Sequence, residues 1–432
     1  MKQPVKVVII AKMKEEYLHY IFKTKQLGKQ FITTNGKQLE IINFGLHNHS
    51  SGPDFLECQI KFDGKIWAGQ IEFHVKSSDW FKHQHQTDTN YNNVIAHFVF
   101  EHDQEIESGK YQLPTVELKS IIDKTNYLKY QTYISSKNWV ACQNEISDLD
   151  PFVIYQQKEK VLFNRLIRKS NKIVNHIELT NGDRQKVFYS ILFKAFGTKI
   201  NQIPFQELAS RFDSKIISKL NNETLKVQAY LFGLAGFLND DSIQDDTYFE
   251  SLKTEFDYQK QLFGLTEMNL KEWKFAAVRP HNYPTVRLAQ LTQILIKNIP
   301  ISKKSRLNKI KDTLEFQLDE YWVNHYMFSR KGKRKNSGLT NSFKELLIIN
   351  VYVPFLFSIG IIEDDLILKE NALSWLEKLN PEVNGIISKW KQLGIEIKSA
   401  FDTQALIEQK NEYCSKSQCI KCKIGQDILK HT

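Results

Sequence analysis

Histidine and acidic residues gather in one short part of this 432-residue sequence. Seven of the twelve histidines lie between His47 and His102, in a stretch that also carries Asp54 and Glu72. Imidazole and carboxylate groups bind metal ions and transfer protons near neutral pH. We therefore expect the chemistry of this chain to lie in its N-terminal region, around Asp54, Glu72 and His74.

Residues 70–76 have the alternating pattern of a β-strand, in which successive side chains point to opposite faces. This pattern places Gln70, Glu72, His74 and Lys76 on one face and three apolar side chains on the other. The apolar face is suited to packing on a core, so the sequence predicts that the polar face carries the site.

A second acidic residue is expected on the neighbouring strand. Asp54 follows a Gly-Pro pair and begins the apolar-polar segment 55–62, and the Asp63-Gly64 pair that follows is a strong hairpin signal. Because a hairpin pairs residues 55–62 with 65–76, the Asp54 carboxylate can converge on Glu72.

Two carboxylates on neighbouring strands suit a hard cation such as Mg²⁺ or Mn²⁺. The cation would polarise a phosphodiester and activate water, and a basic residue, His74 or Lys76, would stabilise the developing charge. The sequence therefore predicts a hydrolase: a metal-dependent nuclease or phosphodiesterase acting on DNA or RNA.

The same features resemble the PD-(D/E)xK nuclease superfamily. The resemblance consists of an opening helix with Glu16, a hairpin, Asp54 beside a proline, and the acid-x-base pattern from Glu72 to His74 or Lys76. It implies a restriction-endonuclease-like fold. The pattern of the superfamily has Lys at the position of His74, and the helix expected after that strand is replaced by a short polar segment.

The histidines also allow other interpretations. A Zn²⁺, Mn²⁺ or Fe²⁺ site, which favours imidazole, would make the chain a metallohydrolase of a small substrate. Without a metal, the histidines would be hydrogen-bonded partners on a polar sheet face. No HExxH motif is present. The candidate ligands are Glu72, His74, His83, His85, Asp88 and His97.

The five cysteines predict a second metal site. Cys414, Cys419 and Cys422 are closely spaced near the C-terminus, and thiolates at such spacing favour Zn²⁺ or an iron–sulfur cluster. Cys142 is the best candidate for a fourth ligand, whereas Cys58 lies inside a predicted strand and is expected in the core. The alternative is a set of reduced thiols in a tail. With a metal, a non-catalytic nucleic-acid-binding or scaffold protein is a further possibility.

Hydrophobic periodicity predicts an α+β fold followed by a helical body. Residues 14–25 form the opening helix, and the predicted strands cover residues 38–44, 55–62, 65–76, 93–101 and 115–119, in a mainly antiparallel sheet. Helical spacing dominates later, for example in residues 155–179, 184–197, 224–238 and 285–299. We expect an α+β domain over residues 1–125 and a helical domain with the cysteine motif over 126–432.

The formal charge of +10 is compatible with binding to nucleic acid through its phosphates. Arg279 and Arg287 flank the start of a predicted helix, and residues 329–335 form the densest basic run. A solvated loop is the alternative for that run. The candidate contacts to nucleic acid are Arg279, Arg287, Arg330, Lys331, Lys333, Arg334 and Lys335.

The sequence favours a cytoplasmic protein without membrane contact. The N-terminal apolar run, residues 7–11, is short for a secretory signal, whose apolar region has about 7–15 residues and is followed by a cleavage site. Residues 346–362 come closest to the about 20 apolar residues of a membrane span, but Asn350, Pro354 and Gly360 interrupt them.

Nearly the whole chain resembles an uncharacterised bacterial family, domain of unknown function 2851. The resemblance implies bacterial cytoplasmic placement and no particular activity. It rests on GPDF at 52–55, GQIEFHVKSSDW at 69–80, HQH at 83–85, RPHNYPTVRLAQL at 279–291, and the YC and CIKCKIG segments of the tail.

Overall fold

The computed structural model describes residues 13–48, 50–108, 111–297, 305–332 and 338–430. The chain forms two compact units, which are described separately. The first unit contains residues 1–157 and 410–432, and the second contains residues 158–409. This division differs from the predicted boundary at residue 125, because the C-terminal segment contacts residues 126–157. For example, the Lys410 ammonium donates to the carbonyl oxygen of Trp139 at 2.6 Å.

The first unit is built on a sheet whose described strands have the order β1-β2-β4-β5-β6-β9, with β3 paired to β4. The pairings from β1 to β5 are antiparallel, whereas β6 runs parallel to both β5 and β9. The α+β class with a mainly antiparallel sheet is therefore confirmed. The strands are β1 (Gln30–Ile32), β2 (Gln38–Asn43), β3 (Leu46–His47), β4 (Phe55–Phe62), β5 (Lys65–Lys76), β6 (Val94–Glu101) and β9 (Thr115–Glu117).

The predicted hairpin between β4 and β5 is confirmed. Asp63 and Gly64 adopt φ values of +51° and +73°, the left-handed conformation that a two-residue hairpin turn requires. Both strands have the bounds that the sequence pattern predicted.

A β-bulge lies at the beginning of β4. The register changes between the Phe55–Ile71 pair and the Cys58–Gly69 pair, and Glu57 in the interval has φ +58°. A bulge bends its strand and changes the direction of nearby side chains. This one lies directly after Asp54.

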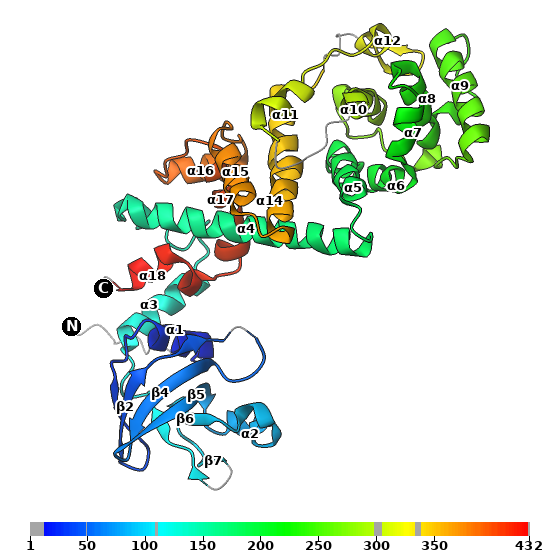
Figure 1. The fold of residues 1–432 in the computed structure, drawn as a ribbon. Coiled ribbons are helices and arrows are strands. Elements are labelled where there is room, and N and C mark those ends of the chain that lie inside the picture. Colours follow the sequence, from blue (N-terminus) through cyan, green and yellow to red (C-terminus); the bar gives the residue numbers. More distant parts are fainter. Residues whose placement is uncertain (1–12, 49, 109–110, 298–304, 333–337, 431–432) are drawn as a thin grey trace. The chain divides into compact units, whose positions relative to one another are not determined.

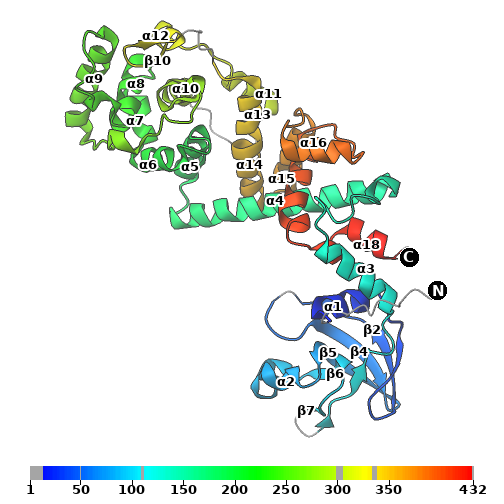
Figure 2. The same cartoon turned by 180° about the vertical axis from the view of Figure 1, so that it is seen from behind.

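Helix α1 (Glu15–Lys23) covers one face of this sheet (Figures 1 and 2). Its residue Phe22 is fully buried, with its ring centroid 4.8 Å from that of Phe55, 5.0 Å from Phe73 and 5.4 Å from Phe98. Tilted and edge-to-face aromatic contacts of this kind stabilise a core and fix the orientation of its rings. The side chains of α1 are thereby held at the sheet.

The opposite face of β5 is covered by the short helix α2 (Asp79–Lys82) and two 3₁₀ turns, His85–Thr87 and Thr89–Tyr91. Trp80 and Tyr91 are buried there. Because these elements cover β5, the middle of the predicted polar face is buried. Glu72 is 5% exposed and His74 is 0% exposed, so both groups lie inside the protein.

The remaining elements of the first unit precede the second unit or form the tail. They include α3 (Lys124–Ser135), the beginning of α4 (Pro151–Leu179), a π-helical segment that begins at Gln409, and α18 (Lys423–Lys430). The backbone N–H of Lys423 donates to Gln157 at 2.8 Å, which joins α18 to the start of α4. Two short strands, β7 (Glu107–Ser108) and β8 (Tyr111–Gln112), form a separate hairpin.

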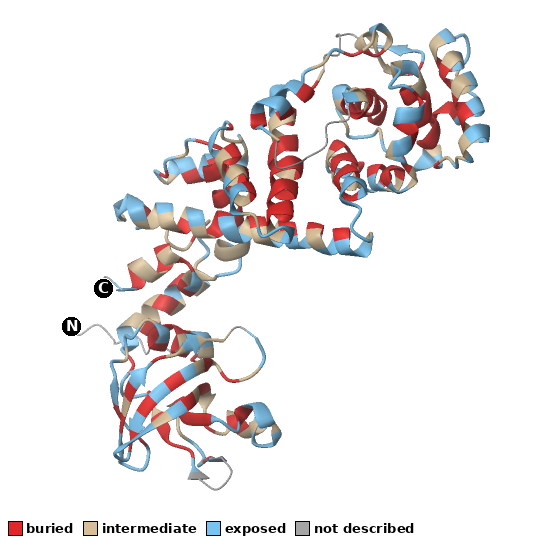
Figure 3. Ribbon diagram, viewed as in Figure 1, coloured by how far each residue is buried: buried red, intermediate tan, exposed pale blue. Residues whose placement is uncertain are grey.

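The second unit is mostly helical, with one large apolar core (Figure 3). One stretch, Asn341–Ile362, is long and apolar enough by composition to cross a membrane, and 72% of its most apolar window is buried in the protein. A short hairpin joins β10 (His325–Met327) and β11 (Arg330–Lys331). The helices are α5 (Arg184–Phe196), α6 (Gln202–Arg211), α7 (Ser214–Lys219), α8 (Thr224–Leu234), α9 (Thr247–Phe263), α10 (Pro284–Lys297), α11 (Leu307–Thr313), α12 (Glu320–Asn324), α13 (Asn341–Leu347), α14 (Val353–Ile362), α15 (Leu366–Glu377), α16 (Gly385–Gln392) and α17 (Ala400–Glu408).

Candidate functional site

Asp54 and Glu72 lie together at the beginning of β4, as the hairpin predicted. The backbone N–H of Asp54 donates to Oε2 of Glu72 at 3.0 Å, and the N–H of Phe73 donates to Oδ2 of Asp54 at 2.9 Å. The charge of Asp54 also raises the pKa of the Glu72 carboxyl group. The two acids therefore share one small region of the sheet.

Burial, followed by the negative charges of Asp54 and Glu15, raises the pKa of Glu72 to about 9. Within the described residues, no lysine or arginine forms an ion pair with any of these three acids. A buried carboxyl group without a cation keeps its proton, because the charged form loses hydration. This region of the protein is therefore suited to a positive ion.

Helix α1 contributes two residues that the sequence analysis missed, Glu15 and His19. Nε2 of His19 lies 3.1 Å from Oδ2 of Asp54 and 3.9 Å from Oε1 of Glu15. Burial, followed by the charge of Asp54, raises the pKa of Glu15 to about 7. Glu15, His19 and Asp54 each offer a ligand atom within 4.8 Å of the others.

Glu16, the predicted helix acid, does not belong to this group. It is about half exposed and lies 3.9 Å from the ammonium of Lys421. Glu15 and His19 are four residues apart and share a helix face. The sequence shows that Glu15 and His19 have this spacing and could act together. Only the tertiary fold identifies which face of α1 points to Asp54.

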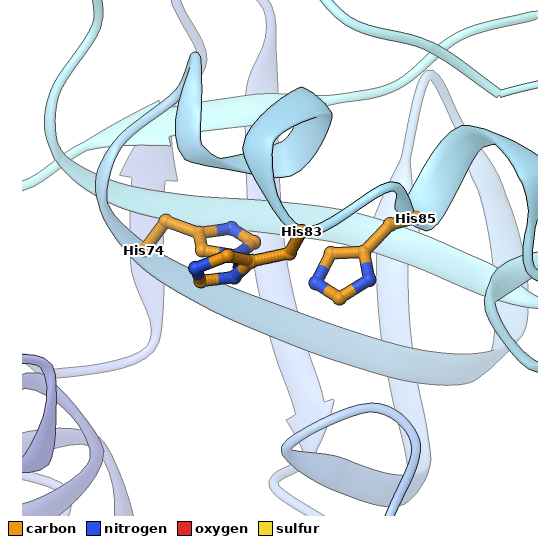
Figure 4. Close-up of side chains that lie close together, drawn as sticks. All are labelled: His74, His83 and His85. Carbon is orange, nitrogen blue, oxygen red and sulfur yellow. Dashed lines mark hydrogen bonds between the residues drawn. The ribbon is translucent and has the colours of Figure 1, made fainter.

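Three histidines form a second group beside Glu72 (Figure 4). His74 comes from β5, whereas His83 and His85 come from the turn after α2. Nε2 of His74 lies 3.1 Å from Nδ1 of His83, and Oε1 of Glu72 lies 3.8 Å from Nε2 of His74 and 3.5 Å from Nε2 of His85. Glu72 therefore touches both groups of candidate ligands.

His97 on β6 contacts the ring of His74. Its Nε2 lies 2.8 Å from Nδ1 of His74, and both residues are fully buried. Burial, followed by the like charges of neighbouring histidines, lowers the pKa of His74 to about 2 and that of His97 to about 3. Burial therefore favours the neutral form of both rings, which is the form that binds metals.

The conformation of residue 84 brings the two histidines of the HQH segment to one side. Gln84 adopts φ +60° and ψ +28°, the left-handed region that residues other than glycine seldom occupy. The ring of His85 stacks on Tyr91 at 3.7 Å and meets the edge of Trp80 at 5.3 Å. Its orientation is therefore fixed by packing.

The base role predicted for His74 or Lys76 and the ligand role predicted for Asp88 have little support in this geometry. Burial lowers the pKa of His74, which disfavours the positive charge expected of a charge-stabilising base. The ammonium of Lys76 is partly exposed and lies 3.6 Å from Oδ2 of Asp103. Asp88, a predicted ligand in the histidine-rich alternative, accepts a hydrogen bond from the N–H of Asn90 and caps a 3₁₀ turn.

A cationic cavity of about 410 Å³ adjoins this region. His47 and Phe55 belong to its wall, and the ring of His47 lies 4.9 Å from that of Phe55 and 5.4 Å from that of His19. Three exposed lysines also line it: Lys23, Lys25 and Lys29. The cavity can receive an anionic group close to the acidic residues.

The four predicted cysteine ligands all belong to the first unit. Burial raises the pKa of Cys142, and the charges of Cys414, Cys422 and Cys419 raise it further, so these three thiols lie within electrostatic range of Cys142. Cys58 is fully buried in β4, as expected for a core residue. The upstream thiol and the thiols of the tail therefore lie in the same part of the first unit.

The basic residues predicted to contact nucleic acid differ in exposure. Arg279, Arg330 and Lys331 are exposed, whereas Lys333, Arg334 and Lys335 lie outside the described residues. Arg287 is buried; its guanidinium donates to Asn282 and Gln290 and stacks on Phe343. These contacts do not fit the predicted role of Arg287 in binding phosphate.

Comparison with known sequences assigns the chain to a family. Residues 15–385 match the family described as Protein of unknown function (DUF2851). The chain belongs to this family. The matched region contains both groups of candidate ligands and Cys142, whereas the cysteines of the tail lie beyond it. No curated protein and no solved structure shows a significant match.

We expect Glu72→Gln to stabilise the metal-free protein at high pH. The folded state holds the Glu72 proton more tightly than the unfolded state, so the wild-type stability falls as pH rises from about 4.5 toward 9. The amide stays neutral, and its advantage should grow over this window to more than about 1.4 kcal/mol, the equivalent of one pKa unit. Thermal unfolding with a chelator at several pH values measures the difference; parallel profiles would contradict the prediction.

Proposed function

We propose that this protein is a metal-dependent hydrolase that cleaves phosphodiester bonds in nucleic acid. The observation that carries the proposal is the pair of half-buried Asp54 and buried Glu72, joined by Glu15 and His19 and not paired with a lysine or arginine in the described residues. Carboxylate oxygens suit Mg²⁺ or Mn²⁺, and one imidazole is compatible with Mn²⁺. A divalent cation held there would polarise the phosphodiester and activate water.

The roles of the residues follow from their contacts. Asp54 would be a direct ligand, because its Oδ2 is fixed by the Phe73 N–H and its charge is close to Glu15 and His19. Glu72 would orient Asp54 through the backbone hydrogen bond and complete the negative charge of the site. Asp54 directly precedes β4 and is fixed by its backbone contacts to β5, while Glu15 and His19 lie on α1, which favours a well-defined metal geometry.

The lysine-lined cavity supports an anionic substrate. Lys23, Lys25 and Lys29 place positive charge on its wall, and His47 and Phe55 connect that wall to the acidic site. Phosphate groups attract such lysines, and aromatic faces stack on bases. The overall charge of +10 favours nucleic acid over a neutral small substrate.

We also propose that Cys142, Cys414, Cys419 and Cys422 hold Zn²⁺ or an iron–sulfur cluster. Three thiols within electrostatic range of Cys142 suit a cation that removes the protons of all four. Such a centre would join the tail to residues 139–145. A non-catalytic nucleic-acid-binding or scaffold protein could hold the same metal centre. The centre therefore does not distinguish that alternative from the hydrolase.

We expect Asp54→Asn to lower metal-dependent cleavage of DNA or RNA by about 100-fold or more, because it removes a charged ligand of the metal. Asp63→Asn is the matched control, since Asp63 is exposed in the hairpin turn and Asn tolerates its positive φ. Cleavage of labelled oligonucleotides with Mg²⁺ or Mn²⁺ measures the effect. Equal activity of the two variants, or binding without cleavage by the wild type, would refute the proposal.

We expect Cys142→Ser to remove the thiol-bound metal as completely as Cys419→Ser, because both would ligate the same ion or cluster. Cys58→Ser should retain the metal, since Cys58 lies in the core of the sheet. Elemental analysis and absorption spectra of anaerobically purified protein provide the test. Retention of full metal content by Cys142→Ser would exclude it as the fourth ligand.

A further inference from the structure

We infer that His74, His83, His85 and the Oε1 atom of Glu72 form a second metal site, which takes a first-row transition-metal dication such as Zn²⁺. This inference rests on the proposed function in one respect: Glu72 would then lie between this ion and the cation at Asp54. The two ions would lie on either side of Glu72, and the protein would hold two neighbouring metal sites.

Two of the separations among these four ligand atoms are close to those expected around one ion, and a third is longer. With metal–ligand bonds of about 2.0–2.1 Å, neighbouring ligand atoms lie about 3.0 Å apart at right angles and about 3.4 Å apart in a tetrahedron. The separations here are 3.1 Å for His74–His83, 3.5 Å for Glu72–His85 and 3.8 Å for Glu72–His74. One nitrogen of each histidine lies within 4.8 Å of the others.

The surroundings prepare His74 and His85 to act as ligands. His97 can accept the Nδ1–H proton of His74 at 2.8 Å, which leaves the lone pair of His74 Nε2 directed at His83 and Glu72. A ligating histidine commonly donates its other N–H in this way. Nε2 of His85 is buried and has no hydrogen-bond partner in the described residues, and it lies on the side of Glu72.

The ligand chemistry identifies the class of ion. Three neutral imidazoles and one carboxylate favour Zn²⁺ and similar transition metals over Mg²⁺, which prefers oxygen ligands. His83 is exposed, so the site can exchange ions and contact a substrate at the surface. The ion would also supply positive charge beside Glu72, where neither His74 nor Lys76 supplies it.

The test is Zn²⁺ binding to the chelator-treated full-length protein. Titration calorimetry and elemental analysis measure the number of Zn²⁺ equivalents bound. We expect His83→Ala and His85→Ala each to bind one equivalent of Zn²⁺ less than the wild type, with the same thiol content. His176→Ala, which changes an exposed histidine of the second unit, should bind as the wild type does. Because His83 is exposed, its variant should keep the wild-type circular dichroism spectrum.

Unchanged Zn²⁺ stoichiometry in the folded His83→Ala and His85→Ala proteins would overturn the inference. Phosphodiester cleavage with Mg²⁺ is measured separately on the same proteins. Loss of one Zn²⁺ equivalent from a wild type that cleaves nothing supports the second site and refutes the proposed hydrolase. Cleavage by the wild type with unchanged Zn²⁺ stoichiometry in the variants overturns the second site and supports the hydrolase.

Discussion

The interaction on which this site depends is the repulsion between carboxyl groups that the fold holds close together in buried and half-buried positions. Asp54 and Glu72 are joined by a backbone hydrogen bond, and Glu15 lies close enough to raise the pKa of Glu72 further. Removing such groups from water is unfavourable unless they are protonated or paired with positive charge. The described residues near them provide histidines rather than lysines, and histidines accept a cation only in their neutral form.

Three local features of the backbone create this arrangement. The bulge after Asp54 changes the direction of the first residues of β4, while α1 places Glu15 and His19 against the same position. The left-handed Gln84 brings His83 and His85 to the same side of the turn. Each feature lies next to the candidate ligands, as is common for bulges and uncommon backbone conformations at functional sites.

Local patterns in the sequence predicted much of the sheet but little of its tertiary neighbourhood. Alternation and the Asp63-Gly64 turn determined β4, β5 and their register, so the proximity of Asp54 to Glu72 was predictable. The choice of Glu15 over Glu16 depends on how α1 rotates on the aromatic core, and no local pattern reports that. His74 is buried by short turns. The apolar residues of these turns have neither the helical nor the strand periodicity, so no sequence pattern predicted them.

The same limit applies to charged residues far from the sheet. Arg287 looked available because it follows a loop and begins a helix, yet its guanidinium packs on Phe343 in the interior. Lys76 continues the polar face of β5, but its long side chain reaches Asp103 instead of the acids. The partners of long side chains depend on the tertiary fold. Sequence spacing alone therefore predicted where the site lies, but not the role of each residue in it.

The most direct test of this account is calorimetric titration of Mn²⁺ into the chelator-treated full-length protein near pH 7.5, in buffers of different ionisation enthalpy. If the acids form the metal site, Mn²⁺ must displace the proton that burial keeps on Glu72. The account predicts binding with release of about one proton or more, and loss of that component in Asp54→Asn. Absence of binding, or binding without proton release that Asp54→Asn leaves unchanged, would contradict it.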